Sequence, residues 1–124
     1  MNKKILGNHY IIDLYNCDSD KLKSVETIEE IMVEAGIIGN LTVVKKCFHQ
    51  FKPYGVSGVL VLKESHFTIH TWYEYNYASI DLFLCDTNIN VDIIIEYLKK
   101  VLGSSKVKNQ FIERGVELSE KYLG

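Results

Sequence analysis

Three extended runs in the middle of the chain, joined by short turns, constrain the fold more than any other feature. Residues 57–64, 67–73 and 79–85 are rich in apolar, β-branched and aromatic side chains at strand-like spacing. The turns expected between them are 65–66 and 75–77. These connections are too short for the crossover that a parallel pair requires, so the three runs must pair antiparallel.

The alternation within these runs assigns side chains to the faces of the sheet. Residues 59–62 are apolar at every position, a pattern typical of a central strand that is covered on both faces. In the next run, Thr68, His70 and Trp72 share one face. We therefore expect the most buried strand of the sheet to lie beside a strand that carries polar and aromatic groups.

Two other segments have the period of an amphipathic helix. Residues 20–35 carry apolar side chains three or four positions apart, and Gly36 is the expected C-cap. Residues 91–102 have the same period, with lysines near the end and Gly103 as the stop. Further strands are expected at residues 9–15, 41–51 and 106–113.

The expected element order is β-α-β-β-β-β-α-β within a single domain of 124 residues. We predict an α+β fold, a two-layer α/β sandwich whose mainly antiparallel sheet carries both helices on one face. The other face must then be either solvated or paired. The aromatic residues in the strands favour pairing, as in a dimer.

Charge and cysteine content exclude several classes of function. The formal net charge is −2 with no basic run, so there is no electrostatic case for binding nucleic acid or a membrane surface. Cys17, Cys47 and Cys85 form no C-x-x-C pair, so neither a metal site nor a disulfide scaffold is predicted. A signal peptide and a run of about 18 apolar residues are both lacking, and we expect a cytoplasmic protein with reduced thiols.

Residues 63–72 (KESHFTIHTW) hold a carboxylate, a hydroxyl and two imidazoles in close succession. Taken singly, Ser65, His70 and Cys85 each suit a purely structural role. Together they bring a hydroxyl, an imidazole and a thiol to what we expect to be one end of the sheet. A hydrolase with Ser65 or Cys85 as nucleophile and His70 as base is disfavoured, because no G-x-S-x-G surrounds the serine and no orienting Asp or Asn is evident.

The stretch 63–72 resembles the self-cleavage motif of the bacterial and archaeal S-adenosylmethionine decarboxylases. The upstream segment 54–59 (YGVSGV) and the downstream segment 78–85 (ASIDLFLC) match the same family, as does the start at residues 6–9 (LGNH). The resemblance covers nearly the whole chain, and its E-S-H-x-T-I-H-T-W core is far more specific than a short motif.

The resemblance implies a pyruvoyl enzyme that is made as a proenzyme. The chain would cut itself between Glu64 and Ser65 into residues 1–64 and 65–124, and Ser65 would become the pyruvoyl group. That group would form a Schiff base with S-adenosylmethionine and release carbon dioxide, supplying the aminopropyl donor for spermidine biosynthesis. Neither pyridoxal phosphate nor a metal would be needed.

Further roles follow from the same resemblance. Ser57 and His70 would assist processing, with His70 transferring a proton, and Cys85 would protonate the product carbon. Phe51 and Trp72 would sandwich the adenine, and Glu74 would hold the ribose hydroxyls. Tyr73, which lies between Trp72 and Glu74 in the sequence, stands where family members often have proline. The family also implies a homodimer of processed protomers with active sites near the interface.

Two other readings stay open at this point. One is a related pyruvoyl-dependent decarboxylase that acts on arginine or ornithine, but the joint presence of Phe51, Trp72 and Glu74 favours a nucleoside substrate. The other is a homologue that does not process itself and serves as a binding or regulatory subunit. Such a chain would be expected to lack the serine, histidine or cysteine that this one retains.

Overall fold

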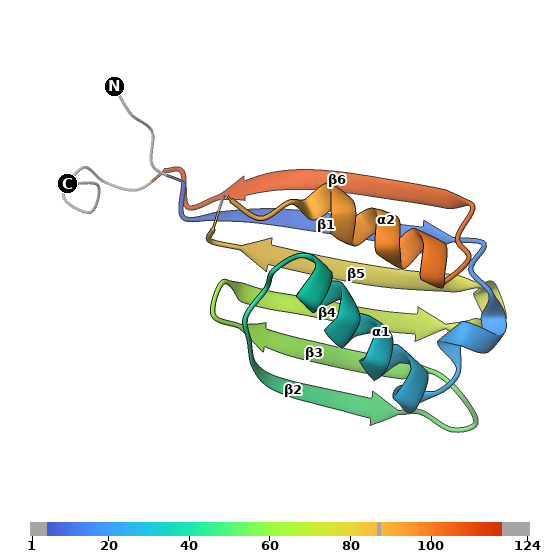
Figure 1. Ribbon diagram of the computed structural model, residues 1–124. Helices are drawn as coiled ribbons and strands as arrows, with labels where there is room; N and C mark the ends of the chain where they lie inside the picture. The colour runs from blue at the N-terminus through green and yellow to red at the C-terminus, as the bar shows by residue number, and fades with distance from the viewer. Residues whose placement is uncertain (1–4, 87, 118–124) are drawn as a thin grey trace.

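The computed structural model describes residues 5–86 and 88–117 (Figure 1). Two single-turn 3₁₀ helices, η1 (Ser19–Leu22) and η2 (Tyr73–Tyr75), lie in the connections between the larger elements. Within the described residues the chain forms six strands and two α-helices, which are β1 (Gly7–Tyr15), α1 (Val25–Ile38), β2 (Val43–Gln50), β3 (Val56–Leu62), β4 (Ser65–Trp72), β5 (Tyr77–Leu84), α2 (Val91–Val101) and β6 (Lys106–Arg114).

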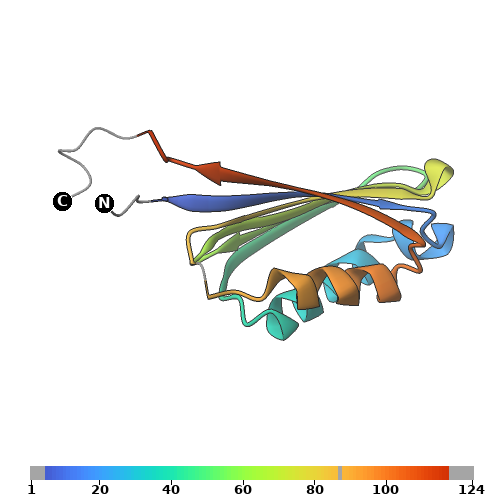
Figure 2. The same cartoon turned by 90° about the horizontal axis from the view of Figure 1, so that it is seen from above.

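The strands form one sheet in the order β2-β3-β4-β5-β1-β6, and every neighbouring pair is antiparallel. Both helices cover the same face of this sheet, so the molecule has two layers (Figures 1 and 2). The predicted α+β sandwich with two helices on one face is therefore confirmed. We call the other side of the sheet, which no helix covers, the open face.

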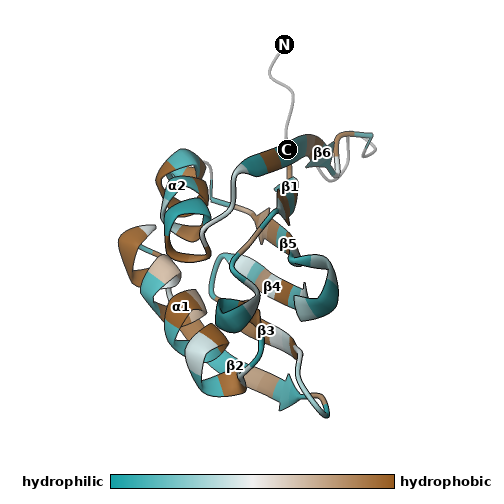
Figure 3. Ribbon diagram, turned by 90° about the vertical axis from the view of Figure 1, so that its right-hand side faces the viewer, coloured by the Kyte–Doolittle hydropathy of each residue, from teal (hydrophilic) through white to brown (hydrophobic). Residues whose placement is uncertain are grey.

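The hydrophobic core fills the space between the helices and the sheet. The strands contribute every second residue to it, as in Ala78, Ile80, Leu82 and Leu84 of β5, all of which are buried. From the helices come residues at helical spacing, and Figure 3 shows α1 and α2 side by side on one side of the strands. Each fully buried aliphatic or aromatic side chain adds roughly 1.5–3 kcal/mol to the stability of the fold.

The first helix differs from the sequence prediction at both ends. Instead of one helix over residues 20–35, η1 is followed by a break at Ser24, whose extended backbone and side chain cap α1; its Oγ accepts from the N–H of Thr27 at 3.3 Å. Gly36 lies inside α1 rather than at its end. The helix stops at Gly39, whose N–H donates to the carbonyl of Ala35.

The central hairpin also differs from the prediction. Its turn is Lys63-Glu64 rather than residues 65–66, so Ser65 is the first residue of β4. The strand β3 is not covered on both faces either. Val59 and Val61 lie on the open face, where they are 37% and 44% exposed, while Leu60 and Leu62 point into the core. The helices of this chain therefore leave these two valines partly exposed.

Neither helix in the described part of the chain has both the length and the apolar character needed to cross a membrane. The three cysteines are all free; Cys17 is buried, and Cys47 and Cys85 are exposed.

Candidate active site

The turn between β3 and β4 is held in place from two sides. The N–H of Lys63 donates to the carbonyl of Thr42 at 2.9 Å, and the N–H of Thr42 donates to Oε1 of Glu64 at 2.9 Å. On the opposite side, the N–H of Cys85 donates to the main-chain carbonyl of Glu64 at 2.8 Å. The carbonyl that joins Glu64 to Ser65 is therefore polarised by a fixed backbone donor.

The backbone of Ser65 has a φ angle of 147°, in a region that residues with a side chain rarely adopt. Such conformations typically cost about 1–3 kcal/mol and persist only where surrounding structure imposes them. Here the imposing structure is the ladder, because Ser65 is paired with Leu62 on one side and Leu84 on the other. Conformational strain therefore lies at the Glu64–Ser65 peptide.

Cys85 follows β5 and lies beside this peptide with an exposed side chain. We call this end of the sheet, defined by Glu64, Ser65 and Cys85, the turn end. The next residue of β4, His66, faces the open side and stacks on Phe83 with ring centroids 5.5 Å apart. Burial, with a smaller contribution from neighbouring His9, lowers the pKa of His66, so its imidazole is neutral at pH 7.

His9 in β1 completes this aromatic group. Its Nδ1 lies 3.3 Å from an Arg114 guanidinium nitrogen, and its Nε2 lies 3.5 Å from Oδ1 of Asp81. A guanidinium can only donate, so Nδ1 accepts from Arg114, and Nε2 faces the Asp81 carboxylate. The arrangement leaves Nε2 at ion-pair distance but without a well-aligned hydrogen bond.

A second group of polar residues lies at the other end of the same strands. Ser57 of β3 and His70 of β4 are direct partners in the sheet, and the serine Oγ is 2.8 Å from Nδ1 of the imidazole. Both side chains are on the open face. This hydrogen bond fixes the ring orientation of His70, and the tautomer of the ring decides which atom donates.

A cavity of about 280 Å³ opens beside this pair. The three residues expected to bind substrate, Phe51, Trp72 and Glu74, all line it. Ser57 and His70 form part of the same wall. The cavity therefore combines two aromatic rings, a carboxylate and a hydrogen-bonded imidazole. We call this end of the sheet, defined by Ser57, His70 and Trp72, the cavity end.

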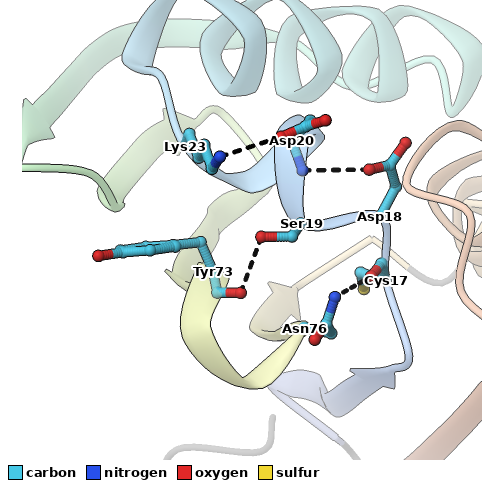
Figure 4. Close-up of polar contacts among 7 residues, drawn as sticks. All are labelled: Cys17, Asp18, Ser19, Asp20, Lys23, Tyr73 and Asn76. Atoms are coloured by element: carbon cyan, nitrogen blue, oxygen red, sulfur yellow. Dashed lines mark hydrogen bonds and ion pairs between the residues drawn. The ribbon is translucent and has the colours of Figure 1, made fainter.

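Contacts with the segment that follows β1 hold η2, which carries Glu74. Figure 4 shows Ser19 and Cys17 beside Tyr73 and Asn76. The hydroxyl of Ser19 donates to the carbonyl of Tyr73 at 3.0 Å, and the amide of Asn76 donates to the carbonyl of Cys17 at 2.9 Å. Asn76 ends η2 in the left-handed conformation, with a φ of 52°. The wall of the cavity after Trp72 is thus tied to the core.

The expectation that Ser65, His70 and Cys85 share one end of the sheet is wrong for a single chain. Ser65 and Cys85 do lie together at the turn end. His70 is five residues further along β4, which at the usual rise places it about 17 Å away. The physical reason is register, because the hairpin pairs His70 with Ser57, at the opposite end from the turn.

Several residues at these two ends were not singled out from the sequence. Tyr54, Gly55 and Thr71 also line the cavity, and all three lie inside the matched motif segments, which could have identified them. The bond from Thr42 to the Glu64 side chain carries no sequence signal, because it depends on how β2 enters the sheet. Among the described residues, no group of three or more His, Cys, Asp or Glu is arranged to hold a metal ion.

Comparison with known proteins places this geometry in context. Residues 8–115 match the family model described as S-adenosylmethionine decarboxylase. The S-adenosylmethionine decarboxylase proenzyme of Thermosipho melanesiensis is 49% identical over 104 residues, covering 84% of this chain and 80% of the relative. That of Thermotoga petrophila is 46% identical over 112 residues, covering 90% and 86%. The crystal structure of the adenosylmethionine decarboxylase from Aquifex aeolicus superposes with a TM-score of 0.85 at 36% identity, covering 94% of this chain and 96% of that one.

Proposed function

The chain belongs to the S-adenosylmethionine decarboxylase family, and from this premise we propose that it is a self-processing, pyruvoyl-dependent decarboxylase of S-adenosylmethionine. Its product would be the aminopropyl donor for spermidine biosynthesis. The observation that carries the proposal is the Glu64–Ser65 peptide. A strained serine follows a carbonyl that already accepts a backbone hydrogen bond, at the position of the family's self-cleavage motif.

The first step of processing is attack by Oγ of Ser65 on the carbonyl carbon of Glu64. The hydroxyl proton is lost, negative charge develops on the carbonyl oxygen, and the N–H of Cys85 already points at that oxygen from 2.8 Å. Collapse breaks the C–N bond, protonates the nitrogen and leaves an ester between the two residues. The step also releases the constraint on the Ser65 backbone.

The second step removes the α-proton of Ser65. β-Elimination then expels the carboxylate of Glu64 as the new C-terminus of residues 1–64 and leaves dehydroalanine at position 65. Tautomerisation to an imine and hydrolysis by one water release ammonia and give the pyruvoyl group at the start of residues 65–124. We assign the proton transfer to His70, whose ring orientation is fixed by Ser57.

The residues at the turn end suit such a group, since Ser65 supplies its three carbons and lies half-buried at the start of β4. Once formed, the pyruvoyl carbonyl supplies an electron sink for the electrons left when carbon dioxide departs. Cys85, exposed beside residue 65, would protonate the product carbon. Phe51 and Trp72 would flank the adenine in the 280 Å³ cavity, and Glu74 would accept hydrogen bonds from the ribose hydroxyls.

A homodimer resolves the separation of about 17 Å between Ser65 and His70. In this dimer the two open faces pack against each other. The two-fold axis lies between the sheets and runs across the strands. It therefore places β4 of one protomer over β4 of the other, with the two strands running in opposite directions. The turn end of each chain then meets the cavity end of its partner, giving two composite sites. Exposed Val59, Val61 and Ile112 on the open face supply apolar surface for this contact.

We place the enzyme in the cytoplasm, where the thiol of Cys85 stays reduced. The two other readings of the sequence have less support. A pocket for arginine or ornithine has no need of two aromatic walls beside a carboxylate. A homologue that does not process itself has no need of strain and a backbone donor at the Glu64–Ser65 peptide.

The test is release of labelled carbon dioxide from carboxyl-labelled S-adenosylmethionine, arginine and ornithine, each offered separately to the purified protein. We expect release from S-adenosylmethionine alone, and none from a Ser65→Ala chain that lacks the hydroxyl. Release from arginine or ornithine but not from S-adenosylmethionine would overturn the substrate assignment. A cleaved chain that releases carbon dioxide from none of the three would overturn the proposed function.

A further inference from the structure

A continuous stack of rings runs across the open face at the cavity end. Trp72 of β4 stacks on Tyr77 of β5, with centroids 5.3 Å apart and planes inclined by 27°. Tyr77 in turn stacks on Tyr15 of β1, at 5.3 Å and 24°. The ammonium group of Lys106 in β6 lies 5.6 Å from the centre of the Tyr15 ring. Four neighbouring strands thus each contribute one member of the stack.

Asp13 of β1 anchors the middle of this stack. The hydroxyl of Tyr77 donates to Oδ1 of Asp13 at 2.5 Å, and the hydroxyl of Tyr15 lies 3.5 Å from Oδ2. Burial and the Asp13 carboxylate both raise the pKa of Tyr77, so its hydroxyl stays protonated and donating well above neutral pH. The register places Lys108 opposite Asp13 in β6. The carboxylate thus fixes the ring of Tyr77 directly, and through Tyr77 it restrains the ring of Trp72.

Within one protomer, Trp72 borders two hollows, so its orientation depends on the contacts its ring makes. It lines the 280 Å³ cavity and also a second, apolar hollow of about 410 Å³, whose other walls are Tyr15, Tyr75 and Tyr77. The indole is 40% exposed, and among the described contacts its side chain makes no hydrogen bond of its own. On the side of the second hollow, the stack with Tyr77 is the ring contact that holds the indole against the first cavity.

We propose that Asp13 and Tyr77 are positioning residues that hold Trp72 at the wall of the substrate cavity and so set the affinity for the adenine portion of the substrate. The proposal rests on the proposed function, in which Trp72 is one face of the adenine site. It assigns no contact with the substrate to either residue. Both act through the orientation of the Trp72 indole. The ring of Tyr77 stacks on the indole, and the carboxylate of Asp13 fixes the position of that ring by a hydrogen bond.

This role separates binding from chemistry. Neither Asp13 nor Tyr77 has a proton-transfer role in the proposed processing, and within one protomer the Glu64–Ser65 peptide lies at the other end of β4, about 17 Å from His70. Loss of the restraint should therefore raise KM for S-adenosylmethionine while leaving kcat and self-cleavage nearly unchanged. An aromatic pair of this kind corresponds to about a three- to tenfold change in KM.

Four variants test the proposal. Tyr77→Phe keeps the ring but removes the hydroxyl, Tyr77→Ala removes both, Asp13→Ala removes the acceptor and Asp13→Asn keeps an acceptor oxygen. Tyr97→Phe in α2 is the matched control, because it deletes a tyrosine hydroxyl far from the stack. Trp72 is the only tryptophan in the chain, so its emission maximum and its quenching by acrylamide report on this ring alone.

We expect Tyr77→Ala to shift the emission furthest to the red, increase quenching most and raise KM most, with Tyr77→Phe and Asp13→Ala intermediate. Asp13→Asn and Tyr97→Phe should stay close to the unmodified chain. Unchanged emission and quenching in Tyr77→Phe and Asp13→Ala would overturn the restraint. Changed emission with unchanged KM would overturn its role in binding. If the unmodified chain were inactive on S-adenosylmethionine, the proposed function would be refuted. The fluorescence of the variants would still show whether Asp13 and Tyr77 restrain the ring of Trp72.

Discussion

Cys85 contributes two different groups to the turn end, and they are separable by mutation. Its backbone N–H donates to the Glu64 carbonyl, whereas its thiol is exposed and free. Cys85→Ala keeps the N–H and removes only the thiol. We therefore expect the variant to cut itself at a normal rate but to lose decarboxylation by about a hundredfold or more, as for loss of a general acid.

The measurement compares the cleavage time course on a denaturing gel with the rate of carbon dioxide release. Cys47→Ala is the matched control, since Cys47 is also exposed but lies on β2. A Cys85→Ala chain that fails to cut itself while remaining folded would show that the thiol, and not the backbone, serves processing.

At the scale of the elements, the β3–β4 turn depends on the Glu64 side chain. Its Oε1 accepts the N–H of Thr42 at 2.9 Å, at a solvent-exposed position. Glu64→Ala frees one anchor of the turn, and we expect self-cleavage to slow about three- to tenfold, as for a net hydrogen-bond loss near 1 kcal/mol. Glu64→Gln keeps an acceptor and should cut almost normally. Equal cleavage rates in both variants would contradict the anchoring role.

The start of α1 allows a stability test that does not involve the active site. Ser24 caps this helix through the N–H of Thr27. Ser24→Ala should lower the free energy of unfolding by about 1 kcal/mol, and Ser24→Asp should largely preserve it. Urea unfolding would be measured in a Ser65→Ala background, so that one intact chain unfolds. A loss of stability as large in Ser24→Asp as in Ser24→Ala would contradict the capping interaction.

The elements show which part of the fold was readable from sequence. Alternation located β1 and β5 closely, because residues at every second position, such as Ile12 and Leu14 or Ile80 and Leu82, are buried in the core. The expected bounds of β6 were also close, although its residues are mostly exposed. Alternation failed at the hairpin, because polar Ser65 and His66 suggested a turn although both belong to the β4 ladder. It also merged η1 with α1, since Leu22 and Val25 keep helical spacing across the break at Ser24.

For the candidate site, the sequence predicted which residues take part but not how they are arranged. Ser65, His70 and Cys85 could be selected from their motif, but their distances depend on register, which the alternation of one strand does not fix. Pairing Ser57 with His70 sends the imidazole to the far end of the hairpin. The hydrogen bond from the Cys85 N–H to Glu64 joins the residue after β5 to the β3–β4 turn, and no side-chain pattern encodes it.

At the scale of the whole molecule, core burial makes stability depend on pH in the alkaline range. Burial raises the pKa of the Cys17 thiol to about 11, from an ordinary value of 9.0. A raised pKa contributes stability that is complete below the unfolded value and is lost as pH rises through the folded value. The free energy of unfolding should therefore fall between about pH 9 and pH 11.

Tyr77, Tyr10 and Tyr97 also have raised pKa values and add to this fall, so the test is a difference between variants. Cys17→Ala should be less stable at pH 8 because it leaves a cavity, but its stability should decline less steeply toward pH 11. Cys47→Ala, at an exposed site, should follow the unmodified chain. Parallel pH curves for Cys17→Ala and the unmodified chain would contradict the assignment.

On the function we propose, this chain converts itself from one polypeptide into two at the Glu64–Ser65 peptide. The most direct measurement is the intact mass of the purified protein under denaturing conditions. We expect two species, residues 1–64 and residues 65–124 with a pyruvoyl group in place of Ser65, and a single uncut species for Ser65→Ala. A single 14.3 kDa species that persists in the unmodified protein after long incubation would contradict the account.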